Sequence, residues 1–125
     1  MKEEINEITY SIIGCAYKVH RTLGPGLLKS TYEACLKEEL ILSGLIVRSQ
    51  VGVPVFYNQK KLEIGYRIDL LVEEKVVLEI KAVDLIAPIH KAQILTYLKL
   101  AGYKIGLLIN FNEINLQNGI TRIIM

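Results

Sequence analysis

Hydrophobic residues in the first part of the chain recur at the spacing of an amphipathic helix. Apolar positions fall three and four residues apart through residues 3–22, and the sequence Leu-Gly-Pro-Gly at positions 23–26 ends this pattern. A second helix is predicted from Ser30 to about residue 43, because Ser30 and Glu33 have the spacing of a capping box. The chain is therefore predicted to begin with two helices.

Short apolar runs then predict strands at residues 46–48, 51–57 and 60–64, with Asn58-Gln59 as the turn before the last run. A near-continuous apolar hairpin follows. Its strands are residues 66–72 and 76–82, and residues 73–75 form its loop.

The last third of the chain predicts a helix between two strands. Pro88 is suited to open a helix that reaches Ala101, and Gly102 fits its C-terminal cap. Residues 104–111 have the character of a buried strand, and residues 119–125 predict an edge strand. Because a helix connects strands 76–82 and 104–111, those two strands are predicted to be parallel.

Charged residues interrupt the apolar hairpin. If Val72 faces Val76, the facing pairs on one side of the hairpin are Leu70–Leu78 and Ile68–Ile80, and on the other side Leu71–Val77, Asp69–Glu79 and Arg67–Lys81. Two facing carboxylates repel each other, and a divalent cation such as Mg²⁺ removes that penalty. Lys81 would place an ammonium beside the ion, where it steadies a phosphate oxygen or an attacking water. The alternative is a solvated face on which the four charged residues form salt bridges.

A polar stripe runs along the third predicted helix. His90, Gln93 and Tyr97 share one side of it, and the apolar side is predicted to hold Ile89, Ala92, Leu95 and Leu98. The stripe either faces solvent or overhangs the site at Lys81.

Composition limits the class of protein. The 125 residues fit one domain, 1–125, and the net charge of +2 permits contact with nucleic acid without requiring it. The hydrophobic share of 51% suggests a buried subunit interface, hence a homodimer, but no apolar run approaches the ~18 residues of a membrane span. Residues 1–10 lack the apolar segment of a secretory signal, so we expect a cytoplasmic protein. Cys15 and Cys35 are predicted to be small buried residues rather than a disulfide or a zinc site.

Several of these residues form known motifs. Asp69 followed by Glu79-Ile80-Lys81 resembles the PD-(D/E)XK nuclease signature, and Gln93 with Tyr97 matches the QxxxY motif of RecB-like members. Nearly the whole chain is similar to the small GxxExxY proteins of that superfamily. The matching positions are His20, residues 23–28, Tyr32-Glu33, residues 68–83, Pro88-Ile89-His90, Ala92-Gln93, Tyr97-Leu98-Lys99 and residues 106–112.

The resemblance implies a PD-(D/E)XK, restriction-endonuclease-like α/β core with a mixed sheet flanked by helices. It implies that Asp69, Glu79 and the main-chain carbonyl of Ile80 bind Mg²⁺ or Mn²⁺, and that Lys81 orients or activates the water that attacks a phosphodiester. Gln93 would position Lys81 or the phosphate.

The remaining expected contacts are with the nucleic acid, most simply DNA. Tyr97 would contact its backbone, and Arg67, His90 and Lys29 would contact phosphates.

The sequence departs from the family at position 29, where the family pattern has Glu and this chain has Lys29. Glu33 could replace that acid, but it also has the capping role, which we favour. The leading hypothesis is a metal-dependent deoxyribonuclease. The alternatives are an inactive nuclease-fold module for binding or assembly, and a subunit whose partner completes the site.

Overall fold

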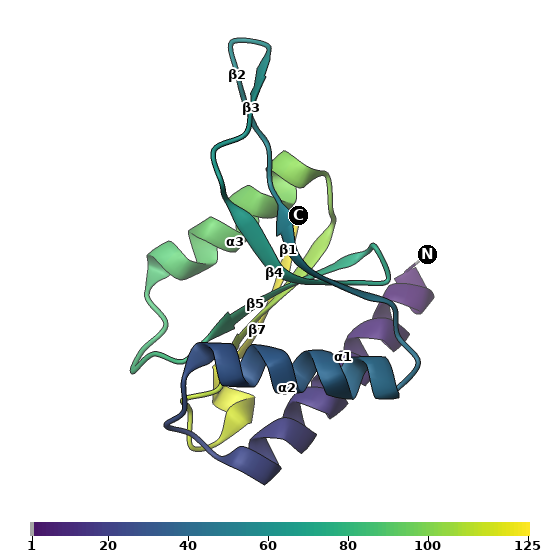
Figure 1. Ribbon diagram of the computed structural model, residues 1–125, viewed down its shortest axis with the longest axis vertical. Coiled ribbons are helices and arrows are strands. Elements are labelled where there is room, and N and C mark those ends of the chain that lie inside the picture. Colours follow the sequence, from purple (N-terminus) through teal and green to yellow (C-terminus); the bar gives the residue numbers. More distant parts are fainter. Residues whose placement is uncertain (1) are drawn as a thin grey trace.

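A computed structural model describes residues 2–125 of the protein. A mixed five-stranded sheet forms its centre, in the order β1-β4-β5-β6-β7. The strands are β1 (Val47–Gly52), β4 (Arg67–Val72), β5 (Val76–Lys81), β6 (Ile105–Asn110) and β7 (Ile120–Ile124). Figure 1 shows α1 (Lys2–Leu23) and α2 (Lys29–Leu42) together on one side, and α3 (Pro88–Ala101) away from them on the other. The predicted α/β class, a mixed sheet flanked by helices, is confirmed.

The first and third helices agree with their predicted bounds. Gly102 is the C-cap of α3, with a φ of 83° and its N–H donated to the carbonyl of Leu98, so the predicted cap is confirmed. A 3₁₀ turn, η1 (Leu116–Gly119), precedes β7 and was not predicted.

The predicted capping box of the second helix is wrong. Helix α2 begins at Lys29, and its N-cap residue, Leu28, makes no side-chain capping bond. Ser30 therefore lies inside the first turn. Glu33 instead accepts a hydrogen bond from Nε2 of Gln50 at 2.7 Å, which turns its carboxylate toward the sheet.

The strands before the hairpin divide differently from the prediction. Strand β1 is continuous across residues 47–52, and Pro54, which has no N–H to donate, lies between it and β2 (Val55–Tyr57). Strand β3 (Lys60–Leu62) pairs with β2 in a separate two-stranded sheet. This small hairpin projects beyond the main body of the molecule (Figure 1).

The predicted register of the central hairpin holds near its loop and changes at Asp69. The pairs Val72–Val76, Leu71–Val77 and Leu70–Leu78 are formed as predicted, and the ladder recorded between β4 and β5 stops there. The predicted pairing of Ile68 with Ile80 on one face is wrong, because Ile80 packs beneath α1 and α2 while Ile68 packs with α3. The side-chain alternation of β4 is thus interrupted at Asp69.

The other predicted pairings hold. Strands β5 and β6 are parallel, with Lys81 beside Asn110, and β7 is an antiparallel edge strand on β6.

Two hydrophobic cores lie on the two faces of the sheet. One contains α1, α2 and buried residues that include Tyr32 and Phe111, and the other contains α3. Helix α3 buries Ile94, Tyr97 and Leu98, so its predicted apolar side is wrong except for Leu98. The other members of that predicted side that are large, Ile89 and Leu95, are 69% and 43% exposed.

Many of the apolar residues of the chain are buried in these two cores.

Of the two free cysteines, Cys15 is buried as predicted and Cys35 is half-buried. None of the helices within residues 2–125 has the combined length and apolarity needed to cross a bilayer.

Gly106 of β6 allows α3 to approach the sheet closely. A Cβ added there would lie 2.8 Å from Cδ1 of Ile94 and 3.2 Å from the carbonyl oxygen of Val77. We predict that Gly106→Ala lowers the free energy of unfolding by about 1–2 kcal/mol in urea denaturation, because the second contact is with rigid backbone. Gly14→Ala on α1, where an added Cβ meets nothing within 4 Å, is the matched control and should raise stability by about 0.5–1 kcal/mol. Equal effects at the two glycines would contradict this account.

Candidate active site on the central strands

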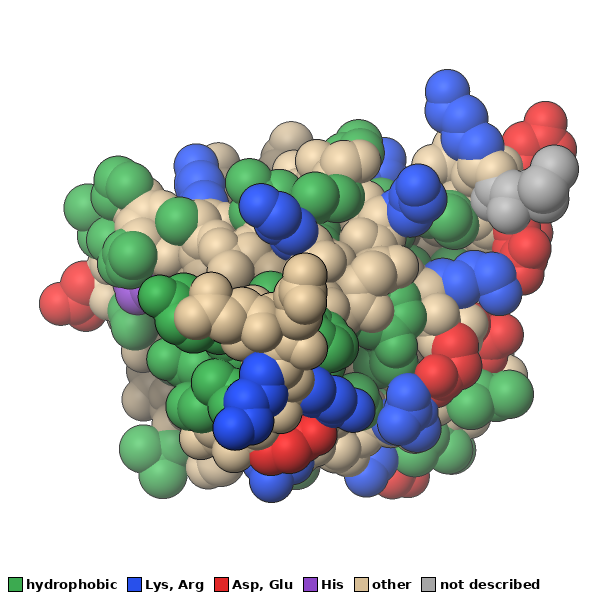
Figure 2. All heavy atoms as spheres, turned by 90° about the horizontal axis from the view of Figure 1, so that it is seen from above, with side chains coloured by type: hydrophobic (Ala, Val, Ile, Leu, Met, Phe, Trp, Pro, Cys, Tyr) green, Lys and Arg blue, Asp and Glu red, His purple; other side chains and the backbone are tan. Residues whose placement is uncertain are grey.

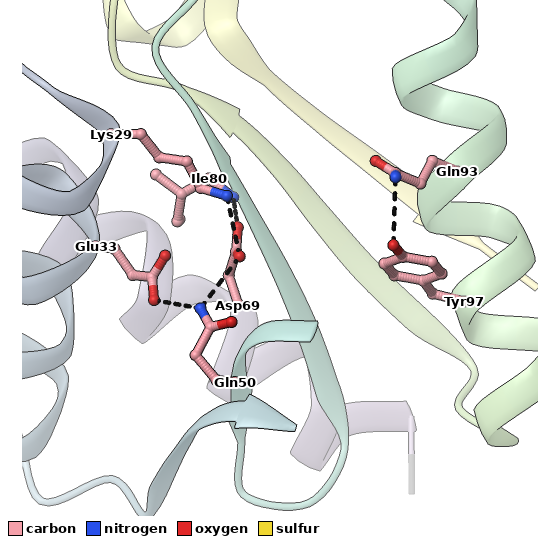
Figure 3. Close-up of polar contacts among 7 residues, drawn as sticks. All are labelled: Lys29, Glu33, Gln50, Asp69, Ile80, Gln93 and Tyr97. Atoms are coloured by element: carbon pink, nitrogen blue, oxygen red, sulfur yellow. Dashed lines mark hydrogen bonds and ion pairs between the residues drawn. The ribbon is translucent and has the colours of Figure 1, made fainter. Parts of the chain in front are cut away.

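Asp69 is a buried carboxylate surrounded by donors from three elements. Its Oδ1 lies 3.1 Å from Nζ of Lys29 on α2 and 3.5 Å from Nε2 of Gln50 on β1, and its Oδ2 accepts the main-chain N–H of Ile80 at 2.9 Å. The side chain of Asp69 is only 6% exposed. Figure 3 shows Lys29, Gln50 and Ile80 converging on it.

Glu79 is buried beside Asp69 on β5, at 4% exposure. Burial, followed by the nearby charge of Asp69, raises the pKa of Glu79 to about 8, and the ammonium groups of Lys29 and Lys81 oppose this shift. Its Oε1 is buried without a hydrogen-bond partner. A buried oxygen left in this state carries a desolvation penalty, so it is suited to bind something.

The strained backbone conformation of Gln50 places its side-chain amide beside the carboxylates of Asp69 and Glu33. Gln50 has a φ of +52°, which is uncommon for a residue other than glycine. It lies between the recorded pairs Ser49–Leu70 and Val51–Ile68, opposite Asp69, where β4 interrupts its alternation. The amide thereby bridges Asp69 and Glu33. Burial is the main cause of the raised pKa of Glu33, and the charge of Asp69 adds to it.

The loop before α2 fixes where Lys29 begins its helix. The hydroxyl of Tyr32 donates to the carbonyl of Gly24 at 2.5 Å and accepts the N–H of Leu27 at 3.1 Å. The Tyr32 ring stacks on Phe111 at a centroid separation of 4.8 Å. The glycine-rich loop is therefore tied to the core directly before Lys29.

Asn110 fixes the chain that leaves Lys81. It is fully buried, its Nδ2 donates to the carbonyl of Val83 at 2.9 Å, and its Oδ1 accepts the N–H groups of Val83 and Asn112. Asn112 in turn accepts the N–H of Gly26 through its Oδ1 at 3.1 Å. The segments beside Lys81 and before Lys29 are thus connected through two asparagines.

Gln93 and Tyr97 form a second polar pair on α3. Nε2 of Gln93 donates to the hydroxyl of Tyr97 at 3.2 Å. Burial is the main cause of the raised pKa of Tyr97, and the charge of Glu79 is the second-largest cause. In Figure 3 strands of the sheet pass between this pair and the residues around Asp69. The polar stripe faces the sheet rather than open solvent.

Two further predicted residues lie outside this group. Nδ1 of His90 accepts the N–H of Ala87 at 3.0 Å and so closes the first turn of α3. Arg67 pairs with Gly52 on β1 rather than with Lys81, and its Nη1 donates to the carbonyl of Gln50 at 3.4 Å.

A sequence model of the PD-(D/E)XK nuclease superfamily matches residues 6–123. The chain belongs to this superfamily. Searches of curated proteins and of solved structures give no significant match.

PD-(D/E)XK nucleases generally use divalent metals, and the residues here fit such an ion. Mg²⁺ is bound in proteins through one or two carboxylates, with water and substrate oxygens completing its shell. Asp69 and Glu79 supply two carboxylates, and the unpartnered Oε1 of Glu79 is a ligand atom in need of a partner. Within residues 2–125 no group of three or more His, Cys, Asp or Glu side chains is arranged to bind a metal ion. Among the described residues the candidate ligand set therefore consists of two acidic side chains, Asp69 and Glu79.

The sequence did not identify Gln50 as a residue of the candidate site, and the capping role predicted for Glu33 is wrong. Gln50 is a polar residue within an otherwise strand-like segment, and its position opposite Asp69 depends on pairing between β1 and β4. Its sequence position alone carried no signal of that pairing.

The raised pKa of Glu79 predicts a pH dependence of stability. The folded protein retains the proton up to about pH 8, whereas the unfolded chain loses it near the ordinary value of 4.5. The contribution of Glu79 to the free energy of unfolding is therefore complete below about pH 4.5 and is lost as the pH rises to about 8. Its upper bound is about 1.4 kcal/mol for each unit by which the pKa is raised. We predict that Glu79→Gln reduces, by a few kcal/mol, the decline in the free energy of unfolding between pH 5 and 8, measured by urea denaturation.

Glu33→Gln provides a comparison, because the pKa of Glu33 is also raised but its side chain is less buried. Glu33→Gln should reduce the decline of stability with pH by less than Glu79→Gln does. A Glu79→Gln protein with the same pH slope as the wild type would show that Glu79 is ionised in the folded state throughout this range.

Proposed function

We propose that the protein is a divalent-metal-dependent nuclease that hydrolyses phosphodiester bonds in DNA. The observation that supports this most strongly is the pair of buried carboxylates, Asp69 and Glu79, with one oxygen of Glu79 lacking a partner. A sheet gains no stability from two neighbouring buried acids, so their presence is explained best by a ligand that needs them.

The proposed roles follow from where each group lies. Asp69 and Glu79, with the main-chain carbonyl of Ile80, would hold Mg²⁺ or Mn²⁺, which when bound supplies stabilisation of negative charge on the phosphate. Lys81 is close enough to Glu79 for its ammonium to affect that pKa, which supports a role for Lys81 in orienting or activating the attacking water.

Residues on α3 and at the edges of the site would position the substrate. Tyr97 would contact the nucleic-acid backbone, with its hydroxyl held by Gln93. Arg67, His90 and Lys29 are proposed phosphate contacts, which contribute affinity without sequence information. Single-domain organisation, a homodimer and a cytoplasmic location stay predictions from the sequence.

The ion pair between Lys29 and Asp69 favours a second candidate, a nuclease-fold module that binds without cleaving. The 3.1 Å contact gives Asp69 a cation from within the chain. A resident ammonium reduces the need for a metal ion at that carboxylate.

Cleavage assays distinguish the two candidates. We predict that the wild type cleaves labelled single- or double-stranded DNA in Mg²⁺ or Mn²⁺, and that Asp69→Asn and Lys81→Ala each reduce the rate about a hundredfold or more. Lys18→Ala, which removes an exposed lysine on α1, should retain the wild-type rate. Cleavage that survives Asp69→Asn would identify a contaminant. A folded wild type that cleaves neither DNA nor RNA supports the second candidate.

Calorimetric titration with Mn²⁺ tests the proposed metal ligands without relying on activity. We predict that the wild type binds Mn²⁺, that Glu79→Gln abolishes binding, and that Lys29→Met tightens it about tenfold, because the ammonium competes for Asp69. Lys37→Met on the same helix is the matched control and should change the affinity less. Unchanged affinity in Lys29→Met would contradict the competition, and a wild type that binds no Mn²⁺ would contradict the metal site.

A further inference from the structure

The β2–β3 hairpin exposes aromatic and basic side chains that neither core uses. Phe56 is 54% exposed and Tyr57 is 68% exposed, and in the hairpin they pair with Lys61 and Lys60. Two-stranded hairpins gain little stability on their own, and exposed rings add none from burial. These side chains are therefore better explained by contact with a partner than by folding.

The hairpin has a defined shape. Asn58 and Gln59 have φ values of 52° and 62°, as a tight two-residue turn of the type I′ form requires. The ribbon extends outward from the main sheet in Figure 1. Viewed from above in Figure 2, hydrophobic and basic side chains intermingle over the middle of this face, while acidic side chains lie mainly toward its right edge.

The base of the hairpin reaches the candidate active site. The N–H of Val53 donates to the carbonyl of Tyr66 at 2.8 Å, and the Tyr66 ring lies 6.1 Å from the ring of Tyr97. Tyr97 is the α3 residue whose pKa is raised partly by the charge of Glu79. The base of the hairpin is thus in contact with the α3 residue that lies close enough to Glu79 to be affected by its charge.

We propose that this hairpin binds an unpaired stretch of nucleic acid and leads it toward Asp69 and Glu79. Exposed aromatic faces stack on bases, which are available in single strands and hidden in a duplex, and nearby lysines attract the phosphates. The charge supports this occupant, since Lys60, Lys61 and Arg67 provide three cations and Glu63, which contacts Lys61 at 3.5 Å, provides one acid. The inference rests on the proposed function and adds to it the form of the substrate.

The length of the ribbon is compatible with this role. At about 3.3 Å a residue, Lys60 near the tip lies at most about 30 Å along the chain from Asp69 on β4. At the duplex spacing of about 3.4 Å per nucleotide that distance corresponds to at most about nine nucleotides, and a more extended single strand would span it with fewer. It lies within the range of site sizes, roughly 4–16 nucleotides, of small single-strand-binding domains.

Fluorescence anisotropy with a labelled 20-nucleotide single strand, in excess chelator so that no metal-dependent cleavage occurs, tests the inference. The double variant Phe56→Ala/Tyr57→Ala is expected to bind at least about tenfold more weakly than the wild type. Lys60→Glu/Lys61→Glu should also weaken binding, and it leaves the aromatic side chains in place. Circular dichroism and thermal melts confirm that each variant is folded.

Two control variants carry matched changes on α1, which lies away from the hairpin in Figure 1. Tyr10→Ala removes a ring that is 82% exposed, and Lys2→Glu/Lys18→Glu makes the same change in charge as Lys60→Glu/Lys61→Glu. Both should bind within about threefold of the wild type. A matching duplex should bind more weakly than the single strand and respond less to the aromatic variant.

The outcomes separate this inference from the proposed function. Loss of single-strand binding in the hairpin variants, but not in the α1 controls, supports the inference even if the protein cleaves nothing. Unchanged binding in folded hairpin variants overturns it even if the protein is an active nuclease. A wild type that fails to bind single strands, or a hairpin effect confined to the duplex, also overturns it.

Discussion

The burial of two neighbouring carboxylates in an apolar sheet is the constraint on which the rest of the site depends. Asp69 is neutralised by Lys29 and stabilised by the N–H of Ile80, whereas burial holds the pKa of Glu79 at about 8. The burial of Glu79 and the nearby charge of Asp69 thus favour the protonated form of Glu79, and the ammonium groups of Lys29 and Lys81 oppose it. A divalent ion at this position has to displace both the Glu79 proton and the Lys29 ammonium, so metal affinity and protonation are coupled.

This balance requires the elements that carry the charges to be held in place. Lys29 comes from the first turn of α2, and Lys81 ends β5, which lies against β6. The contact of Asn112 with Gly26 joins the two regions, and Asn110 holds the chain that follows Lys81. Asn110, which is fully buried and hydrogen-bonded through both atoms of its amide, thus fixes the backbone that follows Lys81.

Sequence patterns predicted those parts of the fold that depend on local periodicity. The α1 and α3 bounds, the β4–β5 hairpin and the parallel β5–β6 pair follow from apolar spacing, punctuation by glycine and proline, and the handedness of crossovers. The pattern failed where tertiary contacts override periodicity. Strict alternation put Ile68 and Leu70 on one face, but the twist at Asp69, opposite the strained Gln50, separates them between two cores.

The predicted apolar face of α3 was wrong for a related reason. A tyrosine counts as polar in a stripe, yet Tyr97 is buried, because its ring packs in the α3 core while its hydroxyl is satisfied by Gln93. The capping box predicted for α2 was a local sequence pattern, but the loop held by Tyr32 determines the start of the helix instead. The helix therefore begins at Lys29, one residue before Ser30. In each case the deciding partner is distant in sequence or belongs to the candidate site.

The strands that carry the site also carry the projecting hairpin. The chain runs from β1 through β2 and β3 into β4, so Gln50 and Asp69 lie at the inner end of the same ribbon whose outer end holds Phe56 and Tyr57. The strained φ of Gln50 lies on β1, two residues before that strand ends and five before β2 begins. A nucleic-acid strand held along the ribbon would meet the carboxylates at a position fixed by the backbone rather than by flexible side chains. That arrangement would give positional control at the proposed cleavage site without any base-specific contact.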